Sequence, residues 1–554
     1  MFPSRVRAAS RRRLPWLAPC RSGPTRCWHG AGRWRSRVGG PHGSPSGDGQ
    51  AACEGRPQHG SVRGVQECLP GGSSPRDSPR EWACGRRLRE RLLGSSDLQG
   101  VLDAVHSGPA VWTPRGLAIG WHRLARHARG RSRSSEVQAA AAVLARAQRQ
   151  AAPCSHEPRE LATVLWAWGK LQFQDEPLLR AMCAHLPSQL HAFNAQDVST
   201  AIYGLALLGA RDERALEALA DAASGRLRQF KGRELANTVY ALGLLEYRHE
   251  ALLEAACLRL LGLLPRLSEQ ELSNSVHALA RLRFEHAGFL RAASAEAAGR
   301  MHEFGPPGLA ALLHGLAVLG FRDSDLLEAA CARALEGLAA FQAREVSNVL
   351  YALGLLGFPH ERLLGAACGQ AAARIVEFSA QHVANVAHAL GRLRHWSEDF
   401  LAAACTHASP RLREFKAQEV SSTVHALGLL RFRDDSFLLA VCQEVPGRLP
   451  EFGEQSLAGL LHALGLLGFR HEALLRAACR HLLAGRVQLT AQGLASALGA
   501  FGRLHFSHQG FLQHARAHLP RLVPEFTVPG IADVTHGLAL LSWRKHLHMR
   551  GKKK

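Results

Sequence analysis

The sequence predicts an all-α solenoid of about eleven helical hairpins, each 37 residues long. Near copies of one segment recur at a strict 37-residue step without insertion or deletion, so that Asn237 and Asn348 begin matching segments three steps apart. Each copy contains two amphipathic stretches separated by a short polar break, the pattern of a helical hairpin. A unit of this size buries its apolar face only against its neighbours, which predicts one elongated array rather than several globular domains.

Residues 1–95 are predicted to form a basic leader. They hold 18 Arg, no Lys and 6 acidic residues, which is +12 of the chain's +22, and leave +10 for residues 96–554. The first 47 residues are rich in Arg, Ser, Pro and Gly and contain no acidic residue, a composition typical of an organelle transit peptide. A disordered basic arm that binds nucleic acid or nothing is the alternative. No run of about eighteen apolar residues occurs, so we expect no membrane insertion.

Residues 96–155 are predicted to be a divergent helical capping segment, because TPRGLAIGWHRLARHA at 113–128 weakly matches the repeating pattern. The array itself covers residues 156–554. Its units start, at what we call position 1, with His156, Phe193, Phe230, Leu267, Phe304, Phe341, Phe378, Phe415, Phe452, Leu489 and Phe526, and the chain ends inside the last one.

The first stretch of each unit is predicted to be an amphipathic helix. Position 6 is Val, Leu or Ile and position 16 is Leu in all eleven units, and positions 6, 10, 13 and 16 fall on one helical stripe. Positions 12 and 14 are Ala or Gly in nearly every unit, as at Ala241 and Gly243. Small residues there would let neighbouring helices approach closely, which outweighs the helix-propensity cost of Gly, about 1 kcal/mol.

The second stretch begins after a break such as FRDS at 321–324 or FRHE at 469–472, where Asp or His and an acidic residue suit a helix start. Its cysteines occupy one place in the unit. Neighbouring helices pack about 8–10 Å apart, beyond the reach of a disulfide, so we expect these cysteines to be small buried apolar residues. They are Cys183, Cys257, Cys331, Cys368, Cys405, Cys442 and Cys479.

Positions 4, 8, 11 and 15 of the first helix lie opposite its apolar stripe and form what we call the polar stripe. They repeat Gln or Arg, Asn or Ser, Tyr or His, and in some units Arg or Lys. Amides can pair with base edges, aromatic and Arg planes can stack on bases, and a cation at position 15 could reach phosphates. The candidate RNA-binding residues are Arg233, Asn237, Tyr240, Gln270, Asn274, His277, Arg281, His314, Arg344, Asn348, Tyr351, Gln381, Asn385, His388, Arg392, Gln418, His425, Gln455 and His462.

A structural explanation of the polar stripe stays open for any single residue. The rings at position 11 could lie between hairpins, and the Asn at position 8 could bond a neighbouring unit as part of an asparagine ladder. No His and carboxylate cluster at metal-ligand spacing recurs, and no paired carboxylates, Gly-rich phosphate loop or Ser/His/Asp arrangement is visible. We therefore expect no cofactor, no metal and no enzymatic activity.

The segments EPRELATVLWAWGKL at 157–171 and QELSNSVHALARLRF at 270–284 resemble helical repeats of organelle RNA-binding proteins. The similar families are the heptatricopeptide and octotricopeptide repeat proteins, the FAST-kinase-domain-containing proteins and their RAP-domain relatives, and the repeat subunits of the kinetoplastid RNA-editing substrate-binding complex. The resemblance covers residues 156–554, and the 37-residue period is similar to the heptatricopeptide class, whereas tetratricopeptide and ankyrin periods do not fit. It implies an α-solenoid whose first helices face RNA. Many relatives end in a RAP domain and this sequence does not, so a fragment remains an alternative.

Together these features predict a solenoid that holds single-stranded organelle RNA by binding rather than chemistry, in RNA processing, stability, editing or ribosomal RNA maturation. Other RNA-processing or ribosome-assembly proteins are expected as further partners. The expected location is the mitochondrial matrix, with the plastid as the alternative. The alternative function is a protein-interaction scaffold of the armadillo or HEAT kind, in which the same stripe grips an extended peptide.

Overall fold

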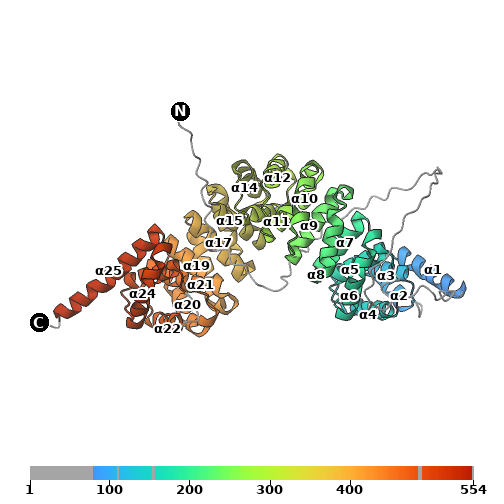
Figure 1. Ribbon diagram of the computed structural model, residues 1–554. Coiled ribbons are helices and arrows are strands. Elements are labelled where there is room, and N and C mark those ends of the chain that lie inside the picture. The colour runs from blue at the N-terminus through green and yellow to red at the C-terminus, as the bar shows by residue number, and fades with distance from the viewer. Residues whose placement is uncertain (1–78, 109–111, 152–155, 485–488, 552–554) are drawn as a thin grey trace, which may run out of the picture. The chain divides into compact units, whose positions relative to one another are not determined.

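The computed structural model describes residues 79–108, 112–151, 156–484 and 489–551 of the 554-residue chain (Figure 1). These residues form twenty-five α-helices, several of them followed by a short 3-10 helix, and contain no β-strand. Helices of successive units pack side by side, so the predicted all-α solenoid is confirmed. The predicted leader falls mostly on residues 1–78, which lie outside the described residues.

One layer of the solenoid consists of the first helices of the units, and each packs on the first helix of the next unit (Figure 1). These helices are α3 (Pro114–His127), α5 (Pro158–Leu171), α7 (Ala195–Leu208), α9 (Gly232–Leu245), α11 (Glu269–Arg281), α13 (Pro306–Val318), α15 (Ala343–Leu356), α17 (Ala380–Leu393), α19 (Ala417–Leu430), α21 (Glu454–Leu467), α23 (Ala491–Arg503) and α25 (Val528–Gly551).

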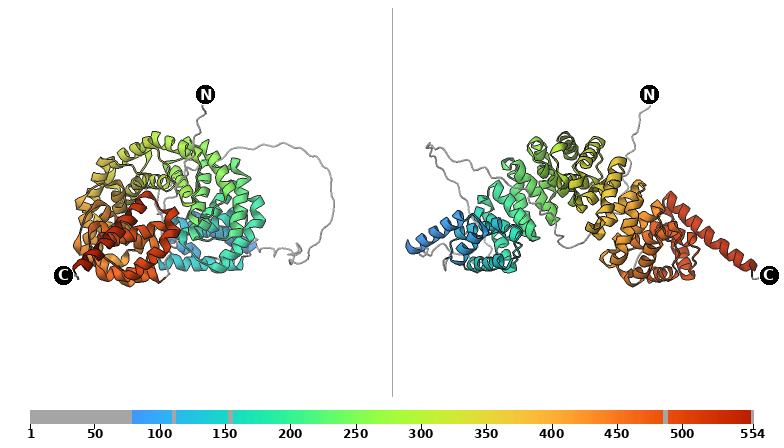
Figure 2. Two further views of the ribbon diagram at one scale, coloured as in Figure 1. Left: turned by 60° about the vertical axis from the view of Figure 1, so that its left-hand side comes forward. Right: turned by 180° about the vertical axis from the view of Figure 1, so that it is seen from behind.

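The other layer consists of the second helices, and Figure 2 shows from two further sides how they alternate with the first. They are α4 (Ser135–Gln150), α6 (Glu176–Gln189), α8 (Glu213–Ser224), α10 (Glu250–Leu261), α12 (Ala287–Gly299), α14 (Ser324–Glu336), α16 (Glu361–Ala373), α18 (Glu398–Ala408), α20 (Asp435–Arg448), α22 (Glu472–Leu483) and α24 (Gln509–Leu522).

The second helices start where the sequence places Asp or His. The carboxylate of Asp323 accepts a hydrogen bond from the Leu326 backbone N–H at 3.0 Å, and the His360 Nδ1 accepts one from Leu363 at 3.2 Å. Each side chain satisfies one of the backbone donors that a helix start leaves unpaired. Most first helices instead carry a capping box, as in α11, where Ser268 and Glu271 bond each other's backbone N–H groups.

The close approach of first helices depends on glycine at position 14. A Cβ at Gly354 would lie 2.7 Å from Ala389 Cα and 2.9 Å from its Cβ, and Gly243 meets Ala278 in the same way. The predicted role of the small residues is therefore confirmed, because no larger side chain fits without a shift of the helices. The array cysteines are buried and free, also as predicted.

The amino-terminal part differs from the expectation of an irregular leader as far as residue 95. Helix α1 (Pro79–Gly94) is formed there, and its Leu88 and Leu92 are buried. Helix α2 (Leu98–His106) follows and packs on α3 and α4, in the segment predicted to be a helical cap. Among the described residues no helix combines the length and apolar character needed to cross a membrane.

Candidate nucleic-acid interface

The outer edge of the polar stripe is open to solvent. At position 4, Arg233, Gln270, Gln381 and Gln418 are exposed, whereas Arg344 and Gln455 are half-buried. These residues stand in the first turns of their helices, on the side turned away from the buried positions 6, 10 and 13.

The asparagines at position 8 do not form a hydrogen-bonded ladder. Asn237, Asn274, Asn348 and Asn385 are all half-buried, and among the described residues no hydrogen bond engages their side-chain amides. The same holds for the amides of Gln270, Gln381 and Gln418 at position 4. An amide offers two donors and an acceptor, so the stripe presents unpaired hydrogen-bonding groups in several successive units. The asparagine ladder that the sequence left open is therefore not formed.

The rings at position 11 contact one another across neighbouring first helices, and we call these side chains the ring row. Its members are His122, Trp166, Tyr203, Tyr240, His277, His314, Tyr351, His388, His425 and His462. Ring centroids lie 5.6 Å apart for His277 and His314, 6.3 Å for His314 and Tyr351, and 5.7 Å for Tyr351 and His388. The pairs Tyr203–Tyr240 and His425–His462 are similar, at 6.5 and 5.8 Å.

The ring row is neither fully buried nor free-standing. All its members are half-buried except Tyr240, which is 9% exposed. Each ring thus packs on a neighbouring ring and keeps part of its surface open beside the amides of positions 4 and 8. The rings therefore lie between successive first helices, as the structural explanation expects, and they also border the exposed stripe.

Burial keeps the histidines of the ring row neutral at pH 7. It lowers the pKa of His277 to about 3 and the pKa values of His314, His388 and His425 to about 4. Nearby charges lower these pKa values further. They come from His314 and Arg281 for His277, from Arg281 for His314, from Arg392 for His388, and from His462 and His388 for His425. The pKa of His462 is also lowered, again mainly by burial. These imidazoles can therefore stack and exchange hydrogen bonds but do not attract phosphate by charge.

The arginines at position 15 are less free than the sequence suggests. Arg281 Nε donates to the Gly243 carbonyl at 2.9 Å, and Arg392 Nε donates to the Gly354 carbonyl at 2.9 Å. Arg281 also pairs with Glu246 at 3.1 Å. Because the first helices lie so close, these side chains reach the preceding helix and tie the two units together. Only their remaining N–H groups could meet a phosphate.

Two further sets of arginines are structural. At position 19, Arg248, Arg322 and Arg433 lie over the Phe at position 18 of the next unit, 5.6–5.7 Å from its centroid, and donate to carbonyls of that unit. At position 34, Arg300 and Arg448 donate to the position 1 carbonyl and pair with a Glu three residues on. Much of the positive charge of the array is thus engaged within the protein.

The register of α3 was missed in the sequence and extends the ring row. Trp112, which is buried, corresponds to position 1, and His122 then falls at position 11, 5.4 Å from the Trp166 ring. The step from His122 to Trp166 is 44 residues rather than 37, so a strict period does not find it. The signal that could have found it is the helix start, because Pro114 and Pro158 each open their helix.

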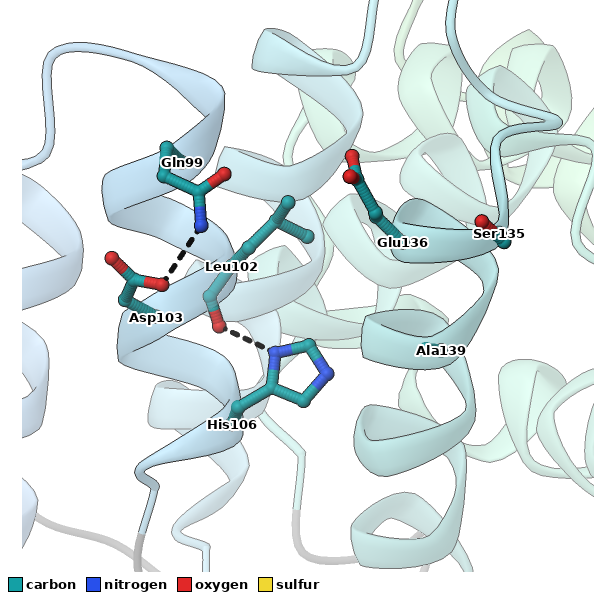
Figure 3. A pocket seen from close by; sticks show the side chains of 7 residues that line it. All are labelled: Gln99, Leu102, Asp103, His106, Ser135, Glu136 and Ala139. Atoms are coloured by element: carbon teal, nitrogen blue, oxygen red, sulfur yellow. Dashed lines mark hydrogen bonds between the residues drawn. The ribbon is translucent and has the colours of Figure 1, made fainter.

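A pocket lies away from the polar stripe, between α2 and α4, and has a volume of about 370 Å³ (Figure 3). His106 Nδ1 meets the Leu102 carbonyl at 2.8 Å, and Gln99 donates to Asp103 at 3.0 Å. Its polar groups therefore bond mainly within α2. Across the described residues, no group of three or more His, Cys, Asp or Glu side chains is placed to hold a metal ion.

Comparison with solved structures finds chains of low similarity. A homology model of the full-length AP-3 complex in an intermediate open conformation has a TM-score of 0.26 and 11% identity, over 84% of this chain and 88% of that one. The karyopherin Kap121p bound to the SUMO protease Ulp1p also has a TM-score of 0.26, with 13% identity, over 83% of this chain and 53% of that one. No curated protein matches the sequence.

One protein family matches the array. The family described as RNA-editing substrate-binding complex 6 protein matches residues 159–287 and 265–509. These matches cover more than half of the chain and begin and end within the repeats that carry the polar stripe. The chain therefore belongs to the RNA-editing substrate-binding complex 6 protein family.

Proposed function

We propose that this protein is a component of an RNA-editing substrate-binding complex and that it binds single-stranded RNA along the polar stripe. The family supports the complex. The observation that carries the RNA-binding proposal is a set of side-chain amides that reach solvent beside the ring row and have no hydrogen-bond partner among the described residues. They are the amides of Asn237, Gln270, Asn274, Asn348, Gln381, Asn385 and Gln418. Buried, unpaired amides would be costly, whereas amides at an open face can bond base edges.

The mechanism is binding rather than bond-breaking. Base-edge contacts to the amides would fix register, and the open parts of the ring row would contribute stacking, worth about 1–3 kcal/mol per base in single-strand binders. Because the paired rings already lie 5.4–6.5 Å apart, a base lies against the row rather than between two paired rings. The modest net charge of the array makes base contacts more important than phosphate contacts.

The proposal includes the mitochondrion as the place of action, with the plastid as the alternative, because the first 47 residues have the composition of a transit peptide. Organelle fractionation of the tagged full chain decides between the two, and its recovery only in the cytosol would remove this part of the proposal.

The binding proposal is tested with the full chain and a pool of single-stranded RNA by fluorescence anisotropy. The variant changes Asn237, Asn274, Asn348 and Asn385 to Ala. Loss of four base-edge contacts should weaken binding by at least tenfold, since each good amide–base pair contributes about 1–3 kcal/mol of discrimination. The matched control changes Thr406, Gln443 and Gln513 to Ala, three exposed polar residues of the second-helix layer, and should bind as the wild type does.

Unchanged RNA affinity in the asparagine variant, with circular dichroism like that of the wild type, would contradict the proposal. Binding of extended peptides in place of RNA would point instead to the interaction scaffold.

A further inference from the structure

The amino-terminal end of the ring row carries a concentration of positive charge. In the two units that begin at Trp112 and His156, positions 4 and 15 are all basic: Arg115, Arg126, Arg159 and Lys170. Arg129 lies two residues after the end of α3, in the connection to α4, and is exposed. At about 100° per residue, positions 4 and 15 share the helix face of the ring at position 11. These cations therefore share the helix faces that carry His122 and Trp166.

Only part of this charge is compensated. Arg115 lies close enough to Glu160, and Arg159 to Asp197, to lower the pKa of each carboxyl, although burial raises both pKa values overall. The two arginines at position 4 thus have acidic neighbours. The position 15 cations do not share them.

Arg126, Arg129 and Lys170 form what we call the cation cluster. Arg126 and Arg129 are exposed, and neither has a hydrogen bond or ion pair with another described residue. Lys170 Nζ lies over the Tyr203 ring, 5.4 Å from its centroid. Its pKa is lowered first by burial and then by the positive charge of Arg129. Helix α3, which precedes Arg129, packs on α5, which carries Lys170. Like charges brought together cost free energy unless an anion joins them.

The same position in later units shows the contrast. Arg281 and Arg392 bond backbone carbonyls of the preceding first helix, and Arg503 pairs with Asp533 at 2.5 Å. A cation in the last turn of a helix also stabilises the helix dipole, by about 0.3–1 kcal/mol. That effect explains a single cation at the end of each helix, Arg126 in α3 and Lys170 in α5. It gives no reason for three cations at the end of the ring row, none of which forms an ion pair with another described residue.

We propose that the cation cluster of Arg126, Arg129 and Lys170 anchors a phosphate group of the bound RNA strand, while the adjoining nucleotide stacks against the open surface of Trp166. This inference rests on the proposed RNA binding and adds to it an end of the array at which the strand is held by charge. Tryptophan offers the largest stacking surface in the ring row, and arginine can grip a phosphate with two parallel hydrogen bonds. The phosphate can be an internal one or the terminal group of the strand.

The test changes Arg126, Arg129 and Lys170 to Gln in the full chain and measures affinity for a single-stranded RNA across a salt series. Each lost phosphate contact lowers the slope of log K against log salt by about 0.7 for single strands. The variant should therefore lose about 2 from this slope and bind at least tenfold more weakly at about 50 mM salt.

The RNA is used with and without a 5′-phosphate. A loss confined to the phosphorylated strand assigns the cluster to the terminal group, and an equal loss with both strands assigns it to an internal phosphate.

Two controls separate the cluster from net charge and from folding. Changing Arg214, Arg291 and Arg362 to Gln removes the same charge from exposed sites on second helices and should leave the slope unchanged. The variant with Arg126→Lys and Arg129→Lys keeps the charge and should keep the wild-type slope, so a general defect of the glutamine variant would be recognised. A wild-type slope in the glutamine variant overturns the inference while RNA binding stands. Absence of single-stranded RNA binding by the wild type overturns both.

Discussion

The histidines of the ring row show how packing decides the chemistry of a single residue. Their spacing predicts an RNA-facing side chain, but the sequence does not reveal their charge state. In the structure each imidazole packs on a neighbouring ring, and burial holds the pKa values of His277, His314, His388 and His425 at about 3 to 4. Neutral rings stack on one another without the repulsion that a row of imidazolium ions would have.

Because these pKa values lie below the unfolded value of about 6.5, acid should destabilise the array. Between about pH 6.5 and 4 the unfolded chain binds protons that the folded chain does not, so stability present above about pH 6.5 is lost as the pH falls towards 4. The loss approaches about 1.4 kcal/mol per pH unit for each histidine. The urea midpoint, followed from about pH 7 to 4, should fall more steeply for the wild type than for a variant with all four histidines changed to Gln. Equal slopes would contradict the buried, neutral ring row.

At the scale of the helix, the first-helix layer depends on glycine where two helices meet. Gly354 has no space for a side chain next to Ala389, whereas a Cβ added at Gly365, in the second helix of the same unit, would meet no neighbouring atom within 4 Å. Substitution by Ala should therefore change the stability of the protein in opposite directions at these two glycines.

Gly354→Ala should destabilise the protein by about 1–3 kcal/mol through overpacking, despite the better helix propensity of Ala. Gly365→Ala should stabilise it by up to about 1 kcal/mol, since Ala is the better helix former and fits there. Thermal unfolding of both variants measures the difference. If both substitutions raise the melting temperature, α15 and α17 do not approach each other so closely.

For the arginines at position 15, the sequence predicts the helix face but not the contacts that the side chains make. The period predicts which face Arg281 and Arg392 occupy, and that placement is correct. It does not predict that the glycine contacts bring the preceding helix within reach, so that Nε bonds its carbonyl instead of remaining free. The interaction follows from the distance between helices, a quantity that helical periodicity alone does not contain.

For the whole molecule, the strict 37-residue step predicts the solenoid and the register of its helices, because each unit meets the same neighbours and has to satisfy the same contacts. Prediction stopped where the step changes. The segment at 113–128 was predicted to be a divergent cap, but its register was not predicted because 44 residues separate His122 from Trp166. The amino-terminal end of the ring row and the cation cluster were therefore not predicted either. The helix α1 was missed because its Arg-rich composition resembles that of the residues before it.

Part of the positive charge of the array is engaged in contacts within the protein. Arginines at position 19 lie over rings and bond carbonyls of the next unit, and those at position 34 bond the carbonyl at position 1 of their own unit. Both sets act as structural links. Net charge therefore overstates how strongly the array attracts a nucleic-acid backbone. The cation cluster is a place at the end of the ring row where Arg126 and Arg129 form no ion pair with another described residue.

The central claim is that RNA lies on the polar stripe of the first helices. Ultraviolet crosslinking of the full chain to single-stranded RNA, followed by mass spectrometry of the crosslinked peptides, tests it most directly. We expect crosslinks at Tyr203, Tyr351, His388 and neighbouring stripe residues across successive units, and at Trp166 near the cation cluster. Crosslinks confined to the second helices, such as α10, α12 and α16, would contradict the claim.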